Sequence, residues 1–257
     1  MKVLLLENIH SEAVRALESR GHEVEVLSSA LDEVELIEAL DGVELLGIRS
    51  RTYITERVLK AHPQLLAVGA FCIGTNQIDL PAAAAAGVAV FNAPYSNTRS
   101  VVELALGEII TLARRLGDRN TSMHAGIWDK SATGSHEVRG RTLGIVGYGN
   151  IGSQLSVLAE GLGMRVYFYD IVDRLALGNA TRVYSLQELF ERCETITLHV
   201  DGRTSNAHMI GEKEFSQMRP RTLFLNLCRG NVVDVDALAA ALRSGHIAGA
   251  AVDVFPG

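Results

Sequence analysis

Cysteine is scarce in this sequence. The 257 residues contain three cysteines, Cys72, Cys193 and Cys228, which lie far apart, are odd in number and lack the spacing of a metal site. This pattern excludes a disulfide-rich scaffold and is typical of buried thiols in a reducing compartment. Apolar residues make up 47% of the chain and charged residues 21%, so disorder and collagen-like structure are excluded as well.

Positive charge and long apolar runs are also lacking. With 24 Lys and Arg against 30 Asp and Glu, the net charge of -6 gives no general attraction to nucleic acid or anionic lipid. No stretch approaches the ~20 apolar residues of a membrane span, and the apolar run near the start is too short for a signal peptide. We therefore expect a cytoplasmic protein without nucleic-acid or membrane partners.

Apolar runs alternate with helical patterns along the whole chain. Near-continuous apolar strands separated by helices are typical of a parallel sheet covered on both faces. The expected strands are residues 3–6, 24–27, 43–48, 65–71, 88–91, 142–147, 166–169, 195–200, 222–227 and 247–254. Because this length suits two domains, we predict an α/β fold of two doubly wound parallel-sheet domains, residues 1–97 and 98–257.

Two helical segments are marked most clearly between these strands. Residues 55–62 begin at a capping Thr55 and stop before Pro63. Residues 99–119 carry apolar side chains at three- and four-residue spacing, which predicts one long helix linking the domains. Trp128, in the polar stretch after it, is expected to be a packing residue rather than a site residue.

A glycine turn is the most specific local signal. The segment Gly147-Tyr148-Gly149-Asn150-Ile151-Gly152 follows an apolar strand and opens a helical stretch. Gly147 permits a tight turn, Gly149 lets the backbone approach a pyrophosphate, and Gly152 lets the helix pack on the strand. The free amides at the helix start, including those of Asn150 and Ile151, favour an anion. The segment therefore predicts a dinucleotide site.

An acidic residue ends the next strand at the expected distance. Asp170 lies 18 residues after Gly152, where a carboxylate accepts the ribose hydroxyls of NAD. The same charge would repel the extra phosphate of NADP by up to ~4 kcal/mol at ~4 Å and an effective dielectric near 20. NAD is therefore the predicted cofactor, although Arg174 could weaken this discrimination. The alternative is that Asp170 merely ends a strand.

Seven segments together resemble the D-isomer-specific 2-hydroxyacid dehydrogenases almost end to end, and most closely the members that act on 3-phosphoglycerate. They are residues 49–52, 71–79, 91–101, 147–152, 167–170, 226–230 and 251–256. The resemblance implies a flavodoxin-like substrate domain into which a Rossmann NAD-binding domain is inserted. It also implies NAD-dependent oxidation of 3-phosphoglycerate, the first step of serine synthesis, and a homo-oligomer formed partly through the long helix.

Arginines are the candidate substrate ligands. Arg229 follows an expected strand at the sheet edge where α/β proteins bind ligands, and its planar fork suits a carboxylate. The family uses this arginine catalytically. Arg49 and Arg51 would flank a phosphate, with the Ser50 hydroxyl and backbone amides supplying further hydrogen bonds. The alternatives are a surface arginine in a turn for Arg229 and two solvated side chains for Arg49 and Arg51.

The resemblance implies several further site residues and no metal site. Asn97 would line the substrate cleft, or alternatively cap the following helix. Residues expected around the cofactor are His199, Val200, Leu227, Cys228 and Asp253. His199 could equally be a packed residue, and Asp253 a helix cap. Cys228 would be sensitive to thiol reagents if Arg229 lowers its pKa.

The sequence departs from the family most clearly at its carboxyl end. In the family, the motif at residues 253–256 is followed by a catalytic Glu and later by an acid/base His, whereas this sequence ends at Gly257. A positioned base contributes about 10²- to 10⁴-fold in rate, so we expect a C-terminally truncated, nearly inactive fragment with an incomplete cofactor domain. The alternatives are another D-2-hydroxyacid dehydrogenase, such as a glyoxylate or hydroxypyruvate reductase, and a non-catalytic NAD(H)-binding protein with protein partners.

Overall fold

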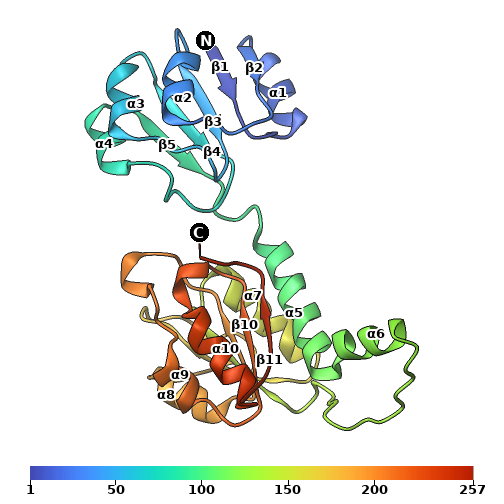
Figure 1. Ribbon diagram of the computed structural model, residues 1–257. Coiled ribbons are helices and arrows are strands. Elements are labelled where there is room, and N and C mark those ends of the chain that lie inside the picture. Colours follow the sequence, from blue (N-terminus) through green and yellow to red (C-terminus); the bar gives the residue numbers. More distant parts are fainter. Residues whose placement is uncertain (257) are drawn as a thin grey trace. The chain divides into compact units, whose positions relative to one another are not determined.

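The computed structural model describes residues 1–256 and divides the chain into two compact units, Met1–Asn97 and Thr98–Gly257. Each unit is an α/β fold built on one parallel sheet, and Figure 1 labels the elements of both. The predicted architecture of two parallel-sheet α/β domains is confirmed. None of the described helices combines the length and apolar character that crossing a bilayer requires.

The first unit has a five-stranded parallel sheet of order β2-β1-β3-β4-β5. Its strands are β1 Lys2–Leu5, β2 Glu23–Val26, β3 Leu45–Ile48, β4 Ala67–Ala70 and β5 Ala89–Asn92, and its helices are α1 Ser11–Glu18, α2 Glu33–Ala39, α3 Glu56–Ala61 and α4 Leu80–Ala85. This is the flavodoxin-like strand order, which reverses between β1 and β3. Ligands bind at the carboxyl ends of the strands where such an order reverses.

Alternating side chains of the first sheet build its two cores. Leu4 and Leu6 belong to the cluster that contains side chains of α2, α3 and α4, whereas Val3 and Leu5 pack with side chains of α1. Local signals set where the helices begin. Asp32 forms a capping box at the start of α2. The predicted cap by Thr55 is present, since its hydroxyl accepts the amide of Val58.

The second unit has a six-stranded parallel sheet of order β11-β10-β9-β6-β7-β8. Its strands are β6 Thr142–Val146, β7 Arg165–Tyr169, β8 Thr181–Arg182, β9 Thr195–Leu198, β10 Thr222–Asn226 and β11 Ile247–Val252, and its helices are α5 Thr98–Arg114, α6 Leu116–His124, α7 Asn150–Gly161, α8 Leu186–Arg192, α9 Glu212–Gln217 and α10 Val235–Arg243. This is the Rossmann order, and it reverses between β6 and β9.

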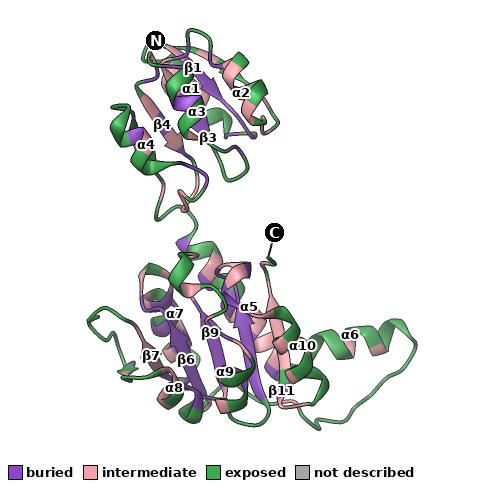
Figure 2. Ribbon diagram, turned by 60° about the vertical axis from the view of Figure 1, so that its left-hand side comes forward, coloured by how far each residue is buried: buried purple, intermediate pink, exposed green. Residues whose placement is uncertain are grey.

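Both faces of the second sheet are covered by helices. Side chains of α5 and α7 pack on one face, and side chains of α8, α9 and α10 pack on the other. Figure 2 shows the consequence, with the central strands buried between helices whose outer faces are exposed. Strands β6, β9 and β10 are buried along their whole length, which explains why their sequences are mainly apolar and carry no charged residue.

The predicted single helix over residues 99–119 is wrong. Helix α5 ends at Arg114, because Arg115 adopts a left-handed conformation with φ 55°, and α6 starts at the next residue. The side chain of Arg115 supports this break by pairing with Asp118 at 2.8 Å.

The prediction that Trp128 is a packing residue is also wrong. Its side chain is 72% exposed and contacts Lys130, whose Nζ lies 4.4 Å from the ring centre.

Candidate cofactor and substrate sites

The glycine turn lies at the carboxyl end of β6, where the strand order of the second sheet reverses. Gly147 has φ 92°, and a Cβ there would lie 2.5 Å from the carbonyl oxygen of His199. A Cβ on Gly152 would overlap the carbonyl of Gly147, so the first turn of α7 packs directly on the glycine turn. A Cβ on Gly149 would meet nothing within 4 Å, which leaves room for a ligand at that position.

The start of α7 offers backbone donors to such a ligand. Gly149 is the N-cap, and no side chain within residues 1–256 caps the helix at this end. The first amides of a helix have no partners within the helix, and they attract anions. Asn150 and Ile151 supply such amides beside the open space at Gly149. This arrangement fits a pyrophosphate, as the sequence predicts.

Asp170 is held beside the glycine turn by the turn itself. Its Oδ2 accepts the amide of Tyr148 at 2.7 Å, and its Oδ1 accepts the amide of Val172 at 2.8 Å. Arg174 lies 3.7 Å from the same carboxylate. Each carboxylate oxygen has a second lone pair, so Asp170 can still accept hydrogen bonds from ribose hydroxyls. The structure therefore gives Asp170 an orienting role within the protein that sequence reasoning did not anticipate.

Tyr148 is a site residue that sequence reasoning missed. Its side chain is buried, its ring stacks on Phe168 with a centroid distance of 3.7 Å, and its hydroxyl lies 2.6 Å from the Ser156 hydroxyl. The same hydroxyl accepts the amide of Leu177 at 3.3 Å. The turn is thus anchored in the core between β7 and α7. An aromatic residue inside the glycine motif was the only available signal.

His199 and Val200 follow β9, next to the glycine turn. The amide of His199 donates to Val146 at 2.7 Å, and its Nε2 lies 3.0 Å from the Thr197 hydroxyl. Its Nδ1 is buried without a partner among the described residues, and this burial lowers the pKa of His199 to about 4. The ring is therefore neutral at physiological pH and packs at the edge of the site, as the packed alternative anticipated.

Arg229 lies in the turn after β10 and is half-buried. The turn is held by Asn226, a buried residue at the end of the strand. Its Nδ2 donates to the carbonyl of Arg229 at 3.1 Å, and its Oδ1 accepts the amide of Cys228 at 3.2 Å. Asp253 follows β11, and its amide donates to the carbonyl of Asn226 at 3.1 Å. The structure thus brings Arg229 and Asp253 to the carboxyl ends of two neighbouring strands.

Cys228 is not an activated thiol. Burial raises the pKa of the Cys228 thiol, and the neighbouring Arg229 does not reverse this shift. The side chain is only 6% exposed. The hypothesis that Arg229 makes Cys228 sensitive to thiol reagents is therefore wrong. Leu227, the residue before it, is also buried at the end of β10 and contributes to the core of this unit.

In the first unit, Arg49, Ser50 and Arg51 follow β3 at the point where that strand order reverses. All three side chains are exposed, and neither arginine has an ion-pair partner within residues 1–256. The expectation that backbone amides of this loop remain available to a phosphate is largely wrong. The amides of Arg49, Arg51 and Thr52 donate to the carboxylate of Glu7.

Asn97 is exposed at the end of the first unit. Its place in the substrate cleft and its alternative role as a helix cap both stay predictions.

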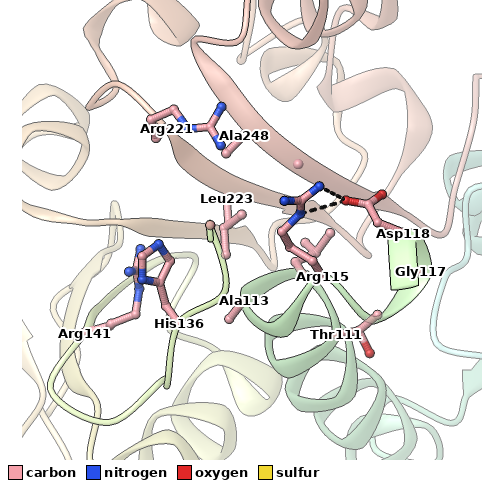
Figure 3. Close-up of a pocket in the computed structure, with 13 residues that line it drawn as sticks. Thr111, Ala113, Arg115, Gly117, Asp118, His136, Arg141, Arg221, Leu223 and Ala248 are labelled. Atoms are coloured by element: carbon pink, nitrogen blue, oxygen red, sulfur yellow. Dashed lines mark hydrogen bonds and ion pairs between the residues drawn. The ribbon is translucent and has the colours of Figure 1, made fainter. Parts of the chain in front are cut away.

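A charged cavity of about 410 Å³ lies elsewhere in the second unit (Figure 3). It is lined by the end of α5, by Arg115 and His136 in the chain after it, and by residues at the amino ends of strands, including Arg141 before β6 and Arg221 before β10. This is the edge of the sheet opposite the glycine turn. None of the predicted site residues lines the cavity, and we do not assign the cofactor to it.

The strand order and the glycine turn of the second unit are those of a dinucleotide-binding domain, and comparison with known proteins agrees. Residues 106–257 match the family model described as D-isomer specific 2-hydroxyacid dehydrogenase, NAD binding domain. The chain belongs to this family, and the second unit is its NAD-binding domain. The sequence-based predictions of the family and of NAD are confirmed.

Individual relatives narrow the comparison. The chain is 52% identical to D-3-phosphoglycerate dehydrogenase of Haemophilus influenzae and 51% identical to that of Escherichia coli, in both cases over 257 residues, which are 100% of this chain and 63% of the relative. The chain thus spans about 63% of the length of these relatives. It is also similar to a solved structure of D-lactate dehydrogenase from Aquifex aeolicus in complex with NAD and lactic acid, with a TM-score of 0.86, 28% identity and coverage of 98% of this chain and 77% of that one.

Proposed function

We propose that this protein oxidises 3-phosphoglycerate to 3-phosphohydroxypyruvate with NAD, the first step of serine synthesis. The observation that carries the proposal is the loop after β3, where Arg49 and Arg51 are exposed and have no acidic partner within residues 1–256. Two unpaired guanidinium groups two residues apart suit a phosphate dianion better than an uncharged substrate end. The high identity to dehydrogenases named for 3-phosphoglycerate supports the same substrate.

The proposed roles divide between the two units. The first unit, residues 1–97, would bind substrate through Arg49, Ser50, Arg51 and Asn97. The second unit, residues 98–257, would bind the cofactor through the residues of the glycine turn (Gly147, Gly149, Asn150, Ile151, Gly152), through Asp170, and through His199, Val200, Leu227, Cys228 and Asp253. We assign the substrate carboxylate to Arg229, because its turn is held rigidly by Asn226.

The proposed reaction requires a cationic side chain of the protein at each end of the substrate, one for the phosphate and one for the carboxylate. When bound, NAD supplies the acceptor for the hydride that leaves the substrate carbon. Arg229 would orient the carboxylate and stabilise negative charge on the adjacent oxygen as the carbonyl forms. We do not assign proton transfer to His199, because its ring is packed and its pKa is about 4. A cytoplasmic homo-oligomer is proposed as the working form.

Steady-state kinetics on the purified protein would test the proposal. The expected result is NAD-dependent turnover of 3-phosphoglycerate, with unphosphorylated 2-hydroxy acids turned over at least tenfold less efficiently. Arg49→Gln combined with Arg51→Gln should raise KM for 3-phosphoglycerate by about 100-fold, if each charge-assisted contact contributes about 1.5 kcal/mol. An equal preference for glyoxylate or hydroxypyruvate would instead identify another reductase of this family. NADH binding without any turnover would favour a non-catalytic binding protein.

A further inference from the structure

Glu7 is a buried carboxylate whose hydrogen bonds all serve one loop. It follows β1 and is 7% exposed. Its Oε1 accepts the amides of Arg49 at 3.1 Å and Thr52 at 3.0 Å, and its Oε2 accepts the amide of Arg51 at 3.1 Å. Since β1 and β3 are neighbours in the sheet, the carboxylate crosses from the end of one strand to the loop after the other.

The backbone at Glu7 shows that this contact is imposed by the surrounding structure. Glu7 has φ 61° and Asn8 has φ 54°. Residues other than glycine seldom adopt this left-handed conformation, and two in succession persist only where their surroundings hold them. The hydrogen bonds from the Arg49–Thr52 loop supply such surroundings. Burial alone would raise the pKa of Glu7, but the hydrogen bonds from Thr52, Arg49 and Arg51 favour the charged form and lower the pKa overall.

The Thr52 hydroxyl favours the charged form of Glu7, but it makes no hydrogen bond of ordinary geometry among the described residues. The inference therefore depends on the three amide contacts.

A second buried side chain holds the same loop from its carbonyl side. Gln77 is 6% exposed, and its Nε2 donates to the carbonyl of Arg49 at 2.7 Å. The thiol of Cys72 lies 3.5 Å from the same carbonyl oxygen. Both the amide and the carbonyl of Arg49 are therefore occupied by side chains from other parts of the unit. The backbone of Arg49 is fixed while its side chain stays exposed.

This arrangement determines how the loop can bind an anion. Successive backbone amides in a loop form a concave anion site. Here that site is already filled by the carboxylate of Glu7. A substrate phosphate would then be left to the guanidinium groups of Arg49 and Arg51 and the hydroxyl of Ser50, whose positions depend on the backbone that Glu7 and Gln77 hold.

We propose that Glu7, together with Gln77, is a positioning residue for recognition of the substrate phosphate. The carboxylate of Glu7 is an anion within the protein that fixes the backbone conformation of the loop. The backbone positions from which the side chains of Arg49 and Arg51 extend are therefore fixed as well. This inference rests on the proposed function, since it concerns the same substrate. It goes further by assigning specificity to two buried residues that would not touch the substrate.

The main test is Glu7→Gln, which keeps the size of the side chain but replaces one acceptor oxygen by a donor that faces amide donors. The matched control is Glu44→Gln. Glu44 also accepts a backbone amide, that of Lys2 at 3.1 Å, but at the amino end of the same sheet. Both variants are made in the version used for the activity measurements, and KM for 3-phosphoglycerate, KM for NAD, kcat and the thermal midpoint are measured for each.

For Glu7→Gln we expect KM for 3-phosphoglycerate to rise about tenfold, the effect of losing one charge-assisted contact, with kcat and KM for NAD within about twofold of the wild type. Glu44→Gln should leave all three unchanged. Hydrogen exchange at the amides of Arg49, Arg51 and Thr52 should become faster only in Glu7→Gln. An unchanged KM for 3-phosphoglycerate in folded Glu7→Gln, or an equal loss in all kinetic constants, would overturn the positioning role.

Gln77→Met keeps the inference open to refutation if Glu7→Gln does not fold. It removes the donor to Arg49 with little change in volume, and KM for 3-phosphoglycerate should rise about threefold or more at constant kcat. An unchanged KM would count against the proposal. Failure of the proposed function has a different signature. Wild-type protein that turns over only unphosphorylated acids would refute the substrate assignment, whereas normal wild-type turnover with unaffected variants would refute the positioning role alone.

Discussion

Alanine at two glycines of one turn should have different effects, lowering stability at Gly147 and cofactor affinity at Gly149. Gly147 has φ 92°, and a Cβ there would lie 2.5 Å from the His199 carbonyl oxygen, which belongs to the backbone and cannot rotate away. The left-handed conformation costs a residue with a Cβ about 1–2 kcal/mol, and an overpacked contact costs about 1–3 kcal/mol. Gly147→Ala should therefore lower the free energy of unfolding of the second unit by about 2–5 kcal/mol.

Gly149→Ala is the matched variant. Gly149 has no atom within 4 Å of its would-be Cβ and a negative φ of -79°, so alanine there should cost less than about 1 kcal/mol as a poorer N-cap. The new methyl group would instead occupy the space at the start of α7 that is assigned to the pyrophosphate. We expect near wild-type stability with NADH affinity reduced about tenfold or more, equivalent to about 1.4 kcal/mol.

Thermal unfolding followed by circular dichroism, and NADH binding followed by fluorescence, would measure both effects. For a unit of this size about 1 kcal/mol corresponds to about 2–4 °C, so Gly147→Ala should melt roughly 4–20 °C below the wild type. A difference of 2 °C corresponds to about half of 1 kcal/mol. The reasoning is therefore refuted if Gly147→Ala melts within 2 °C of the wild type. It is refuted equally if Gly149→Ala binds NADH normally.

Three further changes probe the second unit. Asp170→Asn should weaken NAD binding about tenfold and narrow the preference for NAD over NADP, because the charge that repels a 2′-phosphate is lost; calorimetry with Asp173→Asn as an exposed control would check this. The folded pKa of His199 is about 4 against 6.5 normally, so the unfolded state binds the proton first and stability should fall between pH 6.5 and 4 by on the order of 1 kcal/mol per pH unit. Urea titrations between pH 6.5 and 4 should show that the free energy of unfolding depends less on pH in His199→Gln than in the wild type. In His124→Gln this dependence should be unchanged. Asn226→Ala should reduce kcat/KM about tenfold by releasing the Arg229 turn, whereas Asn231→Ala, whose side chain makes one hydrogen bond within residues 1–256, to Gly202 at 3.4 Å, should not.

Most strand positions could be predicted because most strands are short apolar runs between polar segments, whereas β8, with the sequence Thr181-Arg182, gave no such signal. The predicted ends were too long in several places, because apolar residues outside a strand are also buried. Val43 and Leu65 are 0% and 3% exposed, yet they precede β3 and β4 rather than belonging to them. An apolar run therefore predicts which residues are buried better than it predicts which residues form the hydrogen bonds of a strand. The break at Arg115 could not be foreseen, because arginine rarely takes the left-handed conformation that ends α5.

Motif residues of the candidate site could be predicted, whereas the residues that hold them could not. Glycines at fixed spacing announce a turn, and arginines after strands suggest anion binding. Glu7 gave no such signal, because its partners lie 42 to 45 positions away and meet it only through the order of strands in the sheet. Asn226 lay within a recognised motif, but its bonds to Cys228 and Arg229 depend on the shape of the turn.

The contacts that anchor the glycine turn determine whether its conformational entropy is lost on folding or on binding of the cofactor. Asp170 holds the amide of Tyr148 from one side, while the ring of Tyr148 stacks on Phe168 beneath the turn. The loop is thus immobilised when the chain folds rather than when the dinucleotide arrives. A preorganised loop loses little further freedom on association, so more of the interaction energy remains as affinity. In this unit, the free energy of folding therefore offsets the entropy cost of ordering the loop, and the affinity for the cofactor is higher as a result.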